Sequence, residues 1–232
     1  MTTPSPRAQD AMKRAAAQRA VAAVAEGMVV GLGSDSTAEL ALEALAERMA
    51  QGLRVAGIPT SERSAALARR LGIPLVDFSA HRPIDVAIDG ADQVERGTLN
   101  LLKGRGGALL REKIVASAAN RMIVVVDETK LVDRLGGAVP LPVEIVAFGW
   151  QTVIERIAAI GCAPRLRFAA STPFVTDGGH YIADCVFAGG IDAPAIEARL
   201  KAITGVVETG LFIGLASEVV VGRPGGVEVL IR

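Results

Sequence analysis

Residues 103–113, KGRGGALLREK, place a lysine, a glycine-rich turn and a helix start before a single glutamate, Glu112. If the segment from residue 108 onward is helical, the positions three and four residues from Glu112 are all apolar. Apolar surroundings raise the pKa of a carboxylate and suit it to act as a general base near neutral pH. Arg111 has mostly apolar neighbours by the same test, so spacing alone leaves a solvent-edge ion pair as an equal alternative.

Two aspartates, Asp89 and Asp92, lie in the sequence DGAD at the end of an apolar run that is typical of a strand. Aspartate–glycine pairs are common in turns, so one interpretation is that both carboxylates cap a turn. Asp89, however, closes an apolar strand, where a carboxylate is costly to desolvate without a polar ligand or a cation. We therefore favour a functional role for this pair.

The segment GLGSDST, residues 31–37, precedes a predicted helix and is rich in hydroxyl groups. Ser36 and Glu39 have the spacing of a capping box, which predicts Ser36 as the helix N-cap. The same turn could also hold an anion, with backbone N–H groups and the hydroxyls of Ser34, Ser36 and Thr37 facing a phosphate. A dinucleotide-binding fingerprint fits poorly, because Ser36 occupies its third glycine position and no acidic residue ends the next strand.

The elements that must position these residues alternate along the first part of the chain. We expect helices at 7–25, 36–51, 61–71 and 108–119, and strands at 28–33, 53–60, 73–78, 84–90 and 121–128. Apolar strands alternating with helices predict a parallel sheet covered on both faces. Ligands of such sheets bind at the carboxyl ends of the strands, where all three polar segments fall.

From Pro140 onward the pattern changes. We expect strands at 140–146, 165–170, 173–187 and 205–212, with the third folding back as a hairpin at Asp177-Gly178, and helices at 148–161 and 192–204. This order predicts a smaller α+β domain over residues 139–211. The remaining segments, 1–138 and 212–232, would form the α/β domain, and the C-terminal tail would return to the first sheet.

Composition narrows the class of ligand. Lysine plus arginine and aspartate plus glutamate both total 25, and aromatic residues make up 3% of the chain. The balanced charge gives no general field for nucleic acid or an anionic membrane, and base stacking lacks aromatic side chains. No apolar run approaches the roughly 20 residues of a membrane span, and the N-terminal sequence has no hydrophobic signal region. We expect a cytoplasmic protein that binds a small molecule.

The remaining candidate residues have plainer interpretations. Cys162 and Cys185 lack metal-ligand spacing and are expected to be small core residues. His81 and His180 are candidate bases by residue type alone, and we expect both at the surface. Trp150 and Tyr181 are expected to pack within the smaller domain.

Taken together, these segments resemble ribose-5-phosphate isomerases of the A type. The motifs occur in the same order from about Lys13 to the C-terminal strand: GLGSDSTAEL, IPTSERS, IDGADQV, LLKGRGGALLREKIVASAA, VVVDETKLV, PLPVEIV, FVTDGGHYIADC and GVVETGLF. IDGAD followed by KG-x-GGALLREK is the most specific part.

The resemblance implies an isomerase that interconverts D-ribose 5-phosphate and D-ribulose 5-phosphate in the non-oxidative pentose phosphate pathway, without metal or organic cofactor. It implies a doubly wound, mostly parallel Rossmann-like α/β domain with a smaller, ferredoxin-like α+β domain. It also implies a homo-oligomer, either a dimer or a tetramer.

Roles for individual residues follow from the same resemblance. Glu112 is implied as the proton acceptor, with Asp89, Asp92 and Lys103 as further catalytic residues. The substrate-binding positions implied are Ser34, Asp35, Ser36, Thr37, Gly90, Ala91, Gly104, Arg105, Gly106, Lys130 and, at a further basic position, Lys13.

The chain departs from the family pattern at Asp35, where glycine is usual in the loop expected to approach the phosphate. A carboxylate that points inward would repel a dianion, so either it points outward or phosphate affinity suffers. Gln93 replaces the glutamate that usually follows DGAD, a change we expect to matter little. Arg105 occupies the variable position of the KG-x-GG loop and could add a cation.

Two other functions remain to be weighed. One is a different sugar-phosphate isomerase, or a lactonase, on a related fold. The other is a non-catalytic sugar-phosphate sensor, which would normally carry a DNA-binding helix pair. The N-terminal helix does not provide such a pair, and the balanced net charge does not favour binding to DNA.

Overall fold

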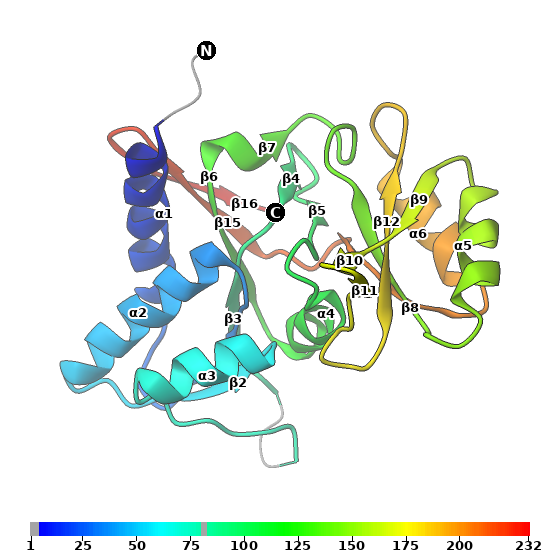
Figure 1. Ribbon diagram of the computed structural model, residues 1–232. Coiled ribbons are helices and arrows are strands. Elements are labelled where there is room, and N and C mark those ends of the chain that lie inside the picture. The colour runs from blue at the N-terminus through cyan, green and yellow to red at the C-terminus, as the bar shows by residue number, and fades with distance from the viewer. Residues whose placement is uncertain (1–4, 80–82) are drawn as a thin grey trace. The chain divides into compact units, whose positions relative to one another are not determined.

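The computed structural model describes residues 5–79 and 83–232, which form two compact units (Figure 1). Unit 1 comprises Met1–Ala91, Arg111–Leu131 and Gly214–Arg232, and unit 2 comprises Asp92–Leu110 and Val132–Ile213. Within the described ranges, no helix has the length and apolar character needed to cross a bilayer. His81 lies outside the described residues.

A six-stranded sheet forms the centre of unit 1, in the order β16-β15-β6-β3-β1-β2. Its strands are β1 Val29–Leu32, β2 Ala56–Pro59, β3 Val86–Asp89, β6 Met122–Asp127, β15 Glu218–Arg223 and β16 Gly226–Ile231. Neighbouring strands are parallel except β15 and β16, which form an antiparallel pair at one edge. The predicted parallel sheet and the return of the C-terminal tail are therefore confirmed.

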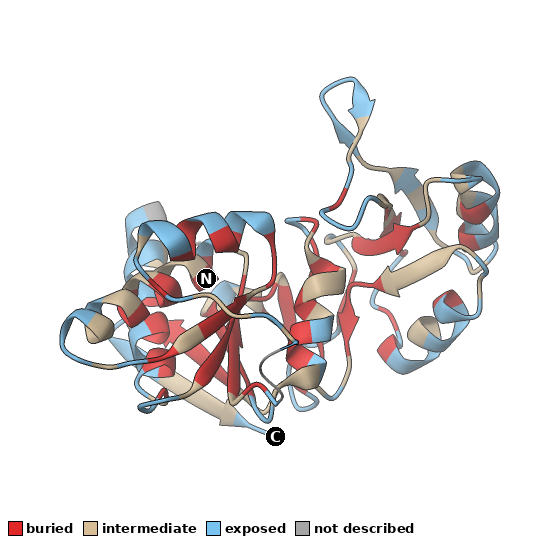
Figure 2. Ribbon diagram, turned by 90° about the horizontal axis from the view of Figure 1, so that it is seen from below, coloured by how far each residue is buried: buried red, intermediate tan, exposed pale blue. Residues whose placement is uncertain are grey.

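Helices cover both faces of this sheet. They are α1 Pro6–Val21, α2 Ser36–Ala50, α3 Glu62–Arg70 and α4 Leu109–Ala118. Val30 and Leu32 of β1 pack into a core shared with α1, α2 and α3. Gly31 faces the other side because strand side chains alternate, and a Cβ there would lie 2.5 Å from Val115 of α4. Figure 2 shows the buried strands between helices whose outer faces are exposed.

The strand expected at 73–78 does not form. The segment makes only an isolated parallel bridge between Leu75 and Gly57 of the edge strand β2. Gly57 donates to the Pro74 carbonyl, and Val76 donates to the Gly57 carbonyl. Pro74 has no N–H to extend the ladder before this point, and Pro59 of β2 has none to extend it after this point.

Unit 2 contains a four-stranded antiparallel sheet in the order β13-β8-β12-β9. Its elements are β8 Leu141–Ile145, α5 Trp150–Ala158, β9 Ala163–Leu166, β12 Tyr181–Val186, α6 Ala193–Lys201 and β13 Val206–Thr209. Val143 and Ile145 point into a core with Ile157 of α5 and Leu200 of α6. The alternate positions Pro142 and Glu144 therefore face the opposite side of the sheet. The expected α+β arrangement of this part is present.

Short strands complete unit 2 and its borders. The sheet β14-β5-β4-β7 consists of β4 Gln93–Glu95, β5 Leu101–Leu102, β7 Leu131–Val132 and β14 Leu211–Phe212, and the 3₁₀-helix η1 spans Glu128–Lys130. Residues 92–110 cluster with the second unit, since β4 pairs with β5 and β5 pairs with β14. Compact units of this kind are not the same as independently folding domains, so the domain bounds 1–138 with 212–232 and 139–211 stay a prediction.

The predicted position of the hairpin, at Asp177-Gly178, was wrong. The chain instead reverses between β10 Phe168–Ala169 and β11 Thr172–Pro173, which pair antiparallel. At Asp177-Gly178 the chain makes a closed loop, in which Thr176 donates its N–H to the His180 carbonyl. The early reversal leaves the segment after Pro173 outside the sheet until β12 begins.

Candidate active site

The loop before α2 is built around Asp35, which is the N-cap of that helix. Its Oδ1 accepts hydrogen bonds from the N–H groups of Thr37 and Ala38, at 2.8 and 2.7 Å. The predicted capping box of Ser36 and Glu39 was therefore wrong, because the cap lies one residue earlier. Asp35 thus occupies two amides that were expected to face a phosphate.

The Asp35 carboxylate also determines what can stand opposite it. A Cβ at Gly90 would overlap the carboxylate atoms of Asp35. Asp35 is half-buried, so its charge turns toward its own helix and toward the start of the DGAD segment. The Asp35 carboxylate therefore does not point outward, which was one of the two alternatives expected for it.

Asp89 ends β3 and is 3% exposed. Its Oδ1 accepts from the N–H of Gly90 at 2.8 Å and from the N–H of Ser34 at 3.3 Å. A Cβ at Gly33 would overlap this carboxylate, so glycine is required where the two loops meet. Asp89 therefore joins the ends of β1 and β3, as their adjacent positions in the sheet predict.

Two hydroxyl residues that sequence reasoning missed, Thr60 and Ser61, hold Ser34. The Ser34 Oγ lies 2.5 Å from the Oγ1 of Thr60 and donates to the Oγ of Ser61 at 2.8 Å. Both follow β2, and both are buried. The rule that pointed to the ends of β1 and β3 applies equally to the end of β2, so a signal for them was present.

Glu112 is 5% exposed and lies in the first turn of α4. It shares a helix face with Val115. A Cβ built at Gly31 of β1 would contact both a methyl group of Val115 and the Cβ of Ala87 in β3, so this face of α4 packs on both strands. Glu112 precedes Val115 by about one helical turn, which moves it roughly 5.4 Å along α4 toward the carboxyl ends of the strands. Asp89 follows Ala87 by two residues, which moves it about 6.6 Å along β3 toward the same ends. The packing of α4 on β1 and β3 therefore directs Glu112 and Asp89 to the same edge of the sheet.

The structure separates Glu112 from its neighbour Arg111. Arg111 donates to Glu62 at 2.9 Å, and the two side chains are 38% and 68% exposed. This hydrogen bond from Arg111 lowers the pKa of Glu62. The solvent-edge ion pair that spacing left open exists, but it belongs to Arg111.

In unit 2, Lys103 follows β5 and is 2% exposed. Its N–H donates to the Gly210 carbonyl at 2.8 Å, and its Nζ lies 5.6 Å from the centre of the Phe212 ring. A Cβ at Gly210 would overlap the Lys103 carbonyl oxygen. The backbone of Lys103 is thus held against the segment between β13 and β14.

The glycine-rich loop after Lys103 folds back on the same unit. Gly104 has a φ of +104° and Gly107 a φ of +85°, a region that side chains rarely adopt. Asp92 accepts the N–H of Arg105 through its Oδ2 at 3.0 Å. Arg105 and Gly106 are exposed. Asp92 therefore holds this loop, a contact that the sequence did not predict.

The remaining predicted positions are more scattered. Ala91 is buried, and Ser36 is exposed at the start of α2. Lys130 is half-exposed at the end of η1, which follows the carboxyl end of β6, and Lys13 is half-buried on α1. Lys130 therefore belongs to the same sheet edge as Asp89, whereas α1 places Lys13 on a covering helix.

His180 is not the surface residue that we expected. Its Nδ1 lies 3.0 Å from the Oε1 of Glu144, which also accepts from the Thr176 hydroxyl at 2.8 Å. Glu144 is 1% exposed on β8. The cluster closes the loop around Asp177-Gly178 and accounts for the partial burial of His180.

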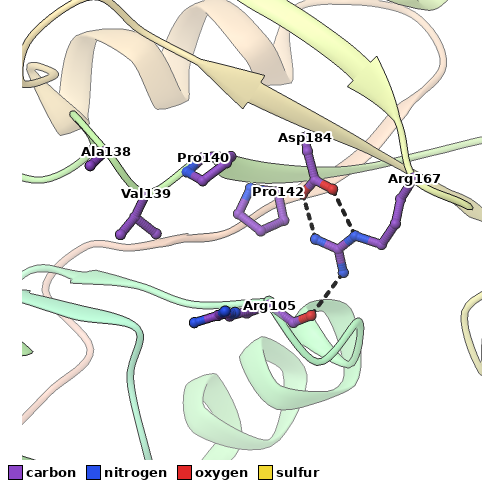
Figure 3. Close-up of a pocket in the computed structure, with 7 residues that line it drawn as sticks. All are labelled: Arg105, Ala138, Val139, Pro140, Pro142, Arg167 and Asp184. Atoms are coloured by element: carbon purple, nitrogen blue, oxygen red, sulfur yellow. Dashed lines mark hydrogen bonds and ion pairs between the residues drawn. The ribbon is translucent and has the colours of Figure 1, made fainter.

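A cavity of about 370 Å³ lies in unit 2 beside the glycine-rich loop. Figure 3 shows its lining, which consists of Arg105, Ala138, Val139, Pro140, Pro142, Arg167 and Asp184. Of these residues only Arg105 was predicted from the sequence. Arg167 donates to the carbonyls of Gly104 and Arg105, and no local pattern in the sequence indicated this.

Comparisons with known proteins point to one family. The family model described as ribose 5-phosphate isomerase A (phosphoriboisomerase A) matches residues 56–226. Ribose-5-phosphate isomerase A of Gluconobacter oxydans is 56% identical over 220 residues, covering 93% of this chain and 94% of the relative. The corresponding protein of Gloeobacter violaceus is 54% identical over 222 residues, covering 95% and 96%.

Solved structures agree with the sequence comparisons. A D-ribose-5-phosphate isomerase in complex with phospho-erythronic acid matches with a TM-score of 0.92 and 38% identity, covering 97% of this chain and 99% of the other. The ribose 5-phosphate isomerase A of Methanocaldococcus jannaschii matches with a TM-score of 0.91 and 40% identity, covering 96% and 99%.

Proposed function

The chain belongs to the ribose-5-phosphate isomerase A family, and we propose that it interconverts D-ribose 5-phosphate and D-ribulose 5-phosphate through an enediolate. The main support within the molecule is Glu112, a buried carboxylate on the face of α4 that packs on β1 and β3. A sensor would need no such base, and family membership favours an isomerase over a sensor or a lactonase.

Aldose–ketose isomerisation moves a proton between C2 and C1 of the open-chain sugar. In this proposal the Glu112 carboxylate removes the C2 proton, and the carbonyl oxygen at C1 gains negative charge as the enediolate forms. Glu112 then returns its proton to C1, while the proton of the C2 hydroxyl passes to the oxygen at C1 and the new carbonyl forms at C2. The Lys103 ammonium stabilises that charge, a type of contribution worth about 3–4 kcal/mol for one good donor. No net electron transfer to another molecule is required.

The other predicted residues orient the substrate in this proposal. Hydroxyl groups of Ser34, Ser36 and Thr37, together with Lys130, bind the phosphate and fix the carbon chain relative to Glu112. Asp89 binds the sugar hydroxyls and assists ring opening. The Asp89 Oδ1 accepts two backbone amides, from Ser34 and Gly90, which hold this carboxylate at the ends of β1 and β3.

The Glu112→Gln variant tests the proposal. We expect it to lower kcat by about 100- to 10,000-fold, the usual contribution of a general base, because the amide cannot accept the proton. Binding should remain close to wild type, measured by calorimetry with phospho-erythronic acid, which carries both a phosphate and a carboxylate.

Glu62→Gln is the matched control, since it makes the same chemical change at the exposed carboxylate that pairs with Arg111, the residue next to Glu112. It should retain wild-type turnover. Substantial activity in Glu112→Gln would remove Glu112 from the proton-transfer role.

The coupled assay with ribose 5-phosphate is best run with and without EDTA. Equal rates are expected, because the proposed steps use only side chains of the chain itself. Loss of activity with EDTA that added metal restores would contradict a metal-free mechanism.

We further propose that the protein works as a homodimer or homotetramer in the cytoplasm, as the family resemblance implies. Large apolar side chains exposed on unit 2 support self-association: Phe148 is 94% exposed, and Phe168 and Val175 are each 55% exposed. Mass photometry should give two or four times the chain mass of 24.0 kDa. A single 24.0 kDa species at working concentration would contradict this.

A further inference from the structure

Arg167, which follows β9 in unit 2, contacts the loop that carries Lys103. Its Nε and Nη2 donate to the two carboxylate oxygens of Asp184, at 2.8 and 2.5 Å. Its Nη1 donates to the carbonyl oxygens of Gly104 and Arg105, at 3.1 and 3.0 Å. Figure 3 shows the guanidinium between the Asp184 carboxylate and the Arg105 carbonyl. One side chain thus holds the two carbonyls that directly follow Lys103.

The guanidinium is suited to this contact because its donors form a rigid planar fork. The bidentate pair with Asp184 fixes the plane of the fork, and the third nitrogen is then directed at the loop. Arg167 and Asp184 are 15% and 26% exposed, so water competes only partly for these bonds. A lysine in this place could not bind both carboxylate oxygens and both carbonyls.

The same network reaches the far end of the loop. The guanidinium carbon lies 5.7 Å from the centre of the Phe174 ring. A Cβ at Gly107 would lie 2.5 Å from the Cζ of that ring, so the ring packs closely against the loop. Asp92 holds the loop from another side by accepting the Arg105 N–H.

We propose that Arg167, oriented by Asp184, is a positioning residue for the isomerase reaction. It fixes the 103–107 loop so that the Lys103 ammonium stays where the oxyanion develops, and it does not itself touch the substrate. This inference rests on the proposed function. A misplaced loop would weaken stabilisation of the transition state more than binding of the substrate, because only the former depends on the charge that develops.

Steady-state kinetics of Arg167→Gln and Arg167→Lys test the inference. We expect kcat to fall about 10- to 100-fold in both, the scale of a displacement of about 1 Å, with less than a threefold change in KM. Arg165→Gln is the matched control, since Arg165 lies two residues earlier, on β9, and is exposed. It should retain wild-type kcat.

Coupling to Lys103 separates positioning from general stabilisation. In a Lys103→Ala background, adding Arg167→Gln should lower kcat by less than about twofold, because both changes remove the same contribution. Guanidinium chloride at millimolar concentration should restore part of the kcat of Arg167→Ala and none of Lys103→Ala. Additive losses, or no rescue together with a raised KM, would overturn the inference.

The outcomes distinguish the two proposals. Absence of ribose 5-phosphate isomerisation by the wild-type protein refutes the proposed function. Wild-type conversion combined with an unchanged kcat in Arg167→Gln refutes only the positioning role. If Arg167→Ala does not fold, Arg167→Lys and Asp184→Asn give the same decision, since each keeps the side-chain volume while weakening the fork.

Discussion

Asp35 places a fixed negative charge at the N-terminus of α2, where the proposed substrate would place its phosphate. The carboxylate satisfies the amides of Thr37 and Ala38, so it stabilises the helix and competes with an incoming anion. The chain thus combines a good helix cap with a weaker anion site than glycine at this position would give.

Asp35→Asn should separate these two effects. Asparagine caps a helix about as well as aspartate, so α2 should keep its stability, while the repulsion of a phosphate is removed. We expect KM for ribose 5-phosphate to fall about fivefold, which corresponds to ~1 kcal/mol of charge repulsion.

The matched control for this charge removal is Asp192→Asn, which makes the same change at the exposed N-cap of α6. It should leave KM unchanged. Competitive inhibition by inorganic phosphate should tighten in Asp35→Asn alone, and an unchanged or higher KM there would contradict the argument.

The two cysteines differ in reactivity. A hydrogen bond from the Cys185 thiol lowers the pKa of Cys162 below its ordinary value of 9.0. The same hydrogen bond and burial raise the pKa of Cys185. A lower pKa means a larger thiolate fraction at pH 8, so iodoacetamide should modify Cys162 first.

When the alkylation rate of Cys162 is plotted against pH, the inflection should lie below pH 9.0 in the wild type. In Cys185→Ala, which lacks the thiol that donates to Cys162, the inflection should move back toward pH 9.0. Mass spectrometry of the peptides identifies the labelled residue. Faster labelling of Cys185 would contradict the assignment. The expectation that both cysteines are core residues holds for Cys185, whereas Cys162 is half-buried.

At the residue scale, the sequence identified polar segments but not the contacts within them. Spacing could not choose between Glu112 and Arg111, because both have apolar helical neighbours, and only the fold shows which one meets Glu62 at the surface. Arg167 could not be predicted, since its contacts with Gly104 and Arg105 span more than 60 residues of sequence. The N-cap of α2 was misplaced because Asp35 and Ser36 are both good capping residues.

The packing of α4 against β1 depends on the absence of a side chain at Gly31. A Cβ there would lie 2.5 Å from a methyl group of Val115 and 3.0 Å from the Cβ of Ala87. Gly31→Ala should therefore push α4 outward, at a cost of about 1–3 kcal/mol in the free energy of unfolding. Because α4 carries Glu112, kcat should fall as well.

Thermal unfolding and steady-state kinetics of Gly31→Ala check both effects. Gly226→Ala is a suitable control, since a Cβ at Gly226 in β16 would have no atom within 4 Å. It should leave both measurements unchanged. A stable Gly31→Ala variant with wild-type kcat would show that α4 does not need this close approach.

Long elements were predicted because their apolar residues repeat with a clear period. The buried strands β1, β3 and β6, for example, are nearly continuous apolar runs. The two- and three-residue strands β4, β5 and β7 were missed, because so few residues carry no period, whereas β14 lies within the strand expected at 205–212. The strand expected at 73–78 had the right composition, but proline at position 74 has no backbone N–H to donate to a neighbouring strand.

For the molecule as a whole, ligand binding should add to stability, because the folded protein binds the sugar phosphate and the unfolded chain does not. At a concentration 100 times its Kd, ribose 5-phosphate should add about 2.7 kcal/mol. This corresponds to a rise in Tm of about 5–10 °C for a chain of this size.

Differential scanning fluorimetry of Glu112→Gln, which should not turn the substrate over, measures this shift. Ribose without phosphate at the same concentration is the control and should give no measurable change. Equal shifts with both ligands would show that the phosphate contributes little to binding.

The close approach of Asp35 and Gly90 has an evolutionary consequence. Because a Cβ at Gly90 would overlap the Asp35 carboxylate, substitutions at the two positions are epistatic. Alanine at position 90 would force the Asp35 carboxylate out of its present place, so we expect mutational paths through this loop to change position 35 first. Lineages that carry glycine at position 35 should tolerate more variation at position 90 than lineages that keep the aspartate.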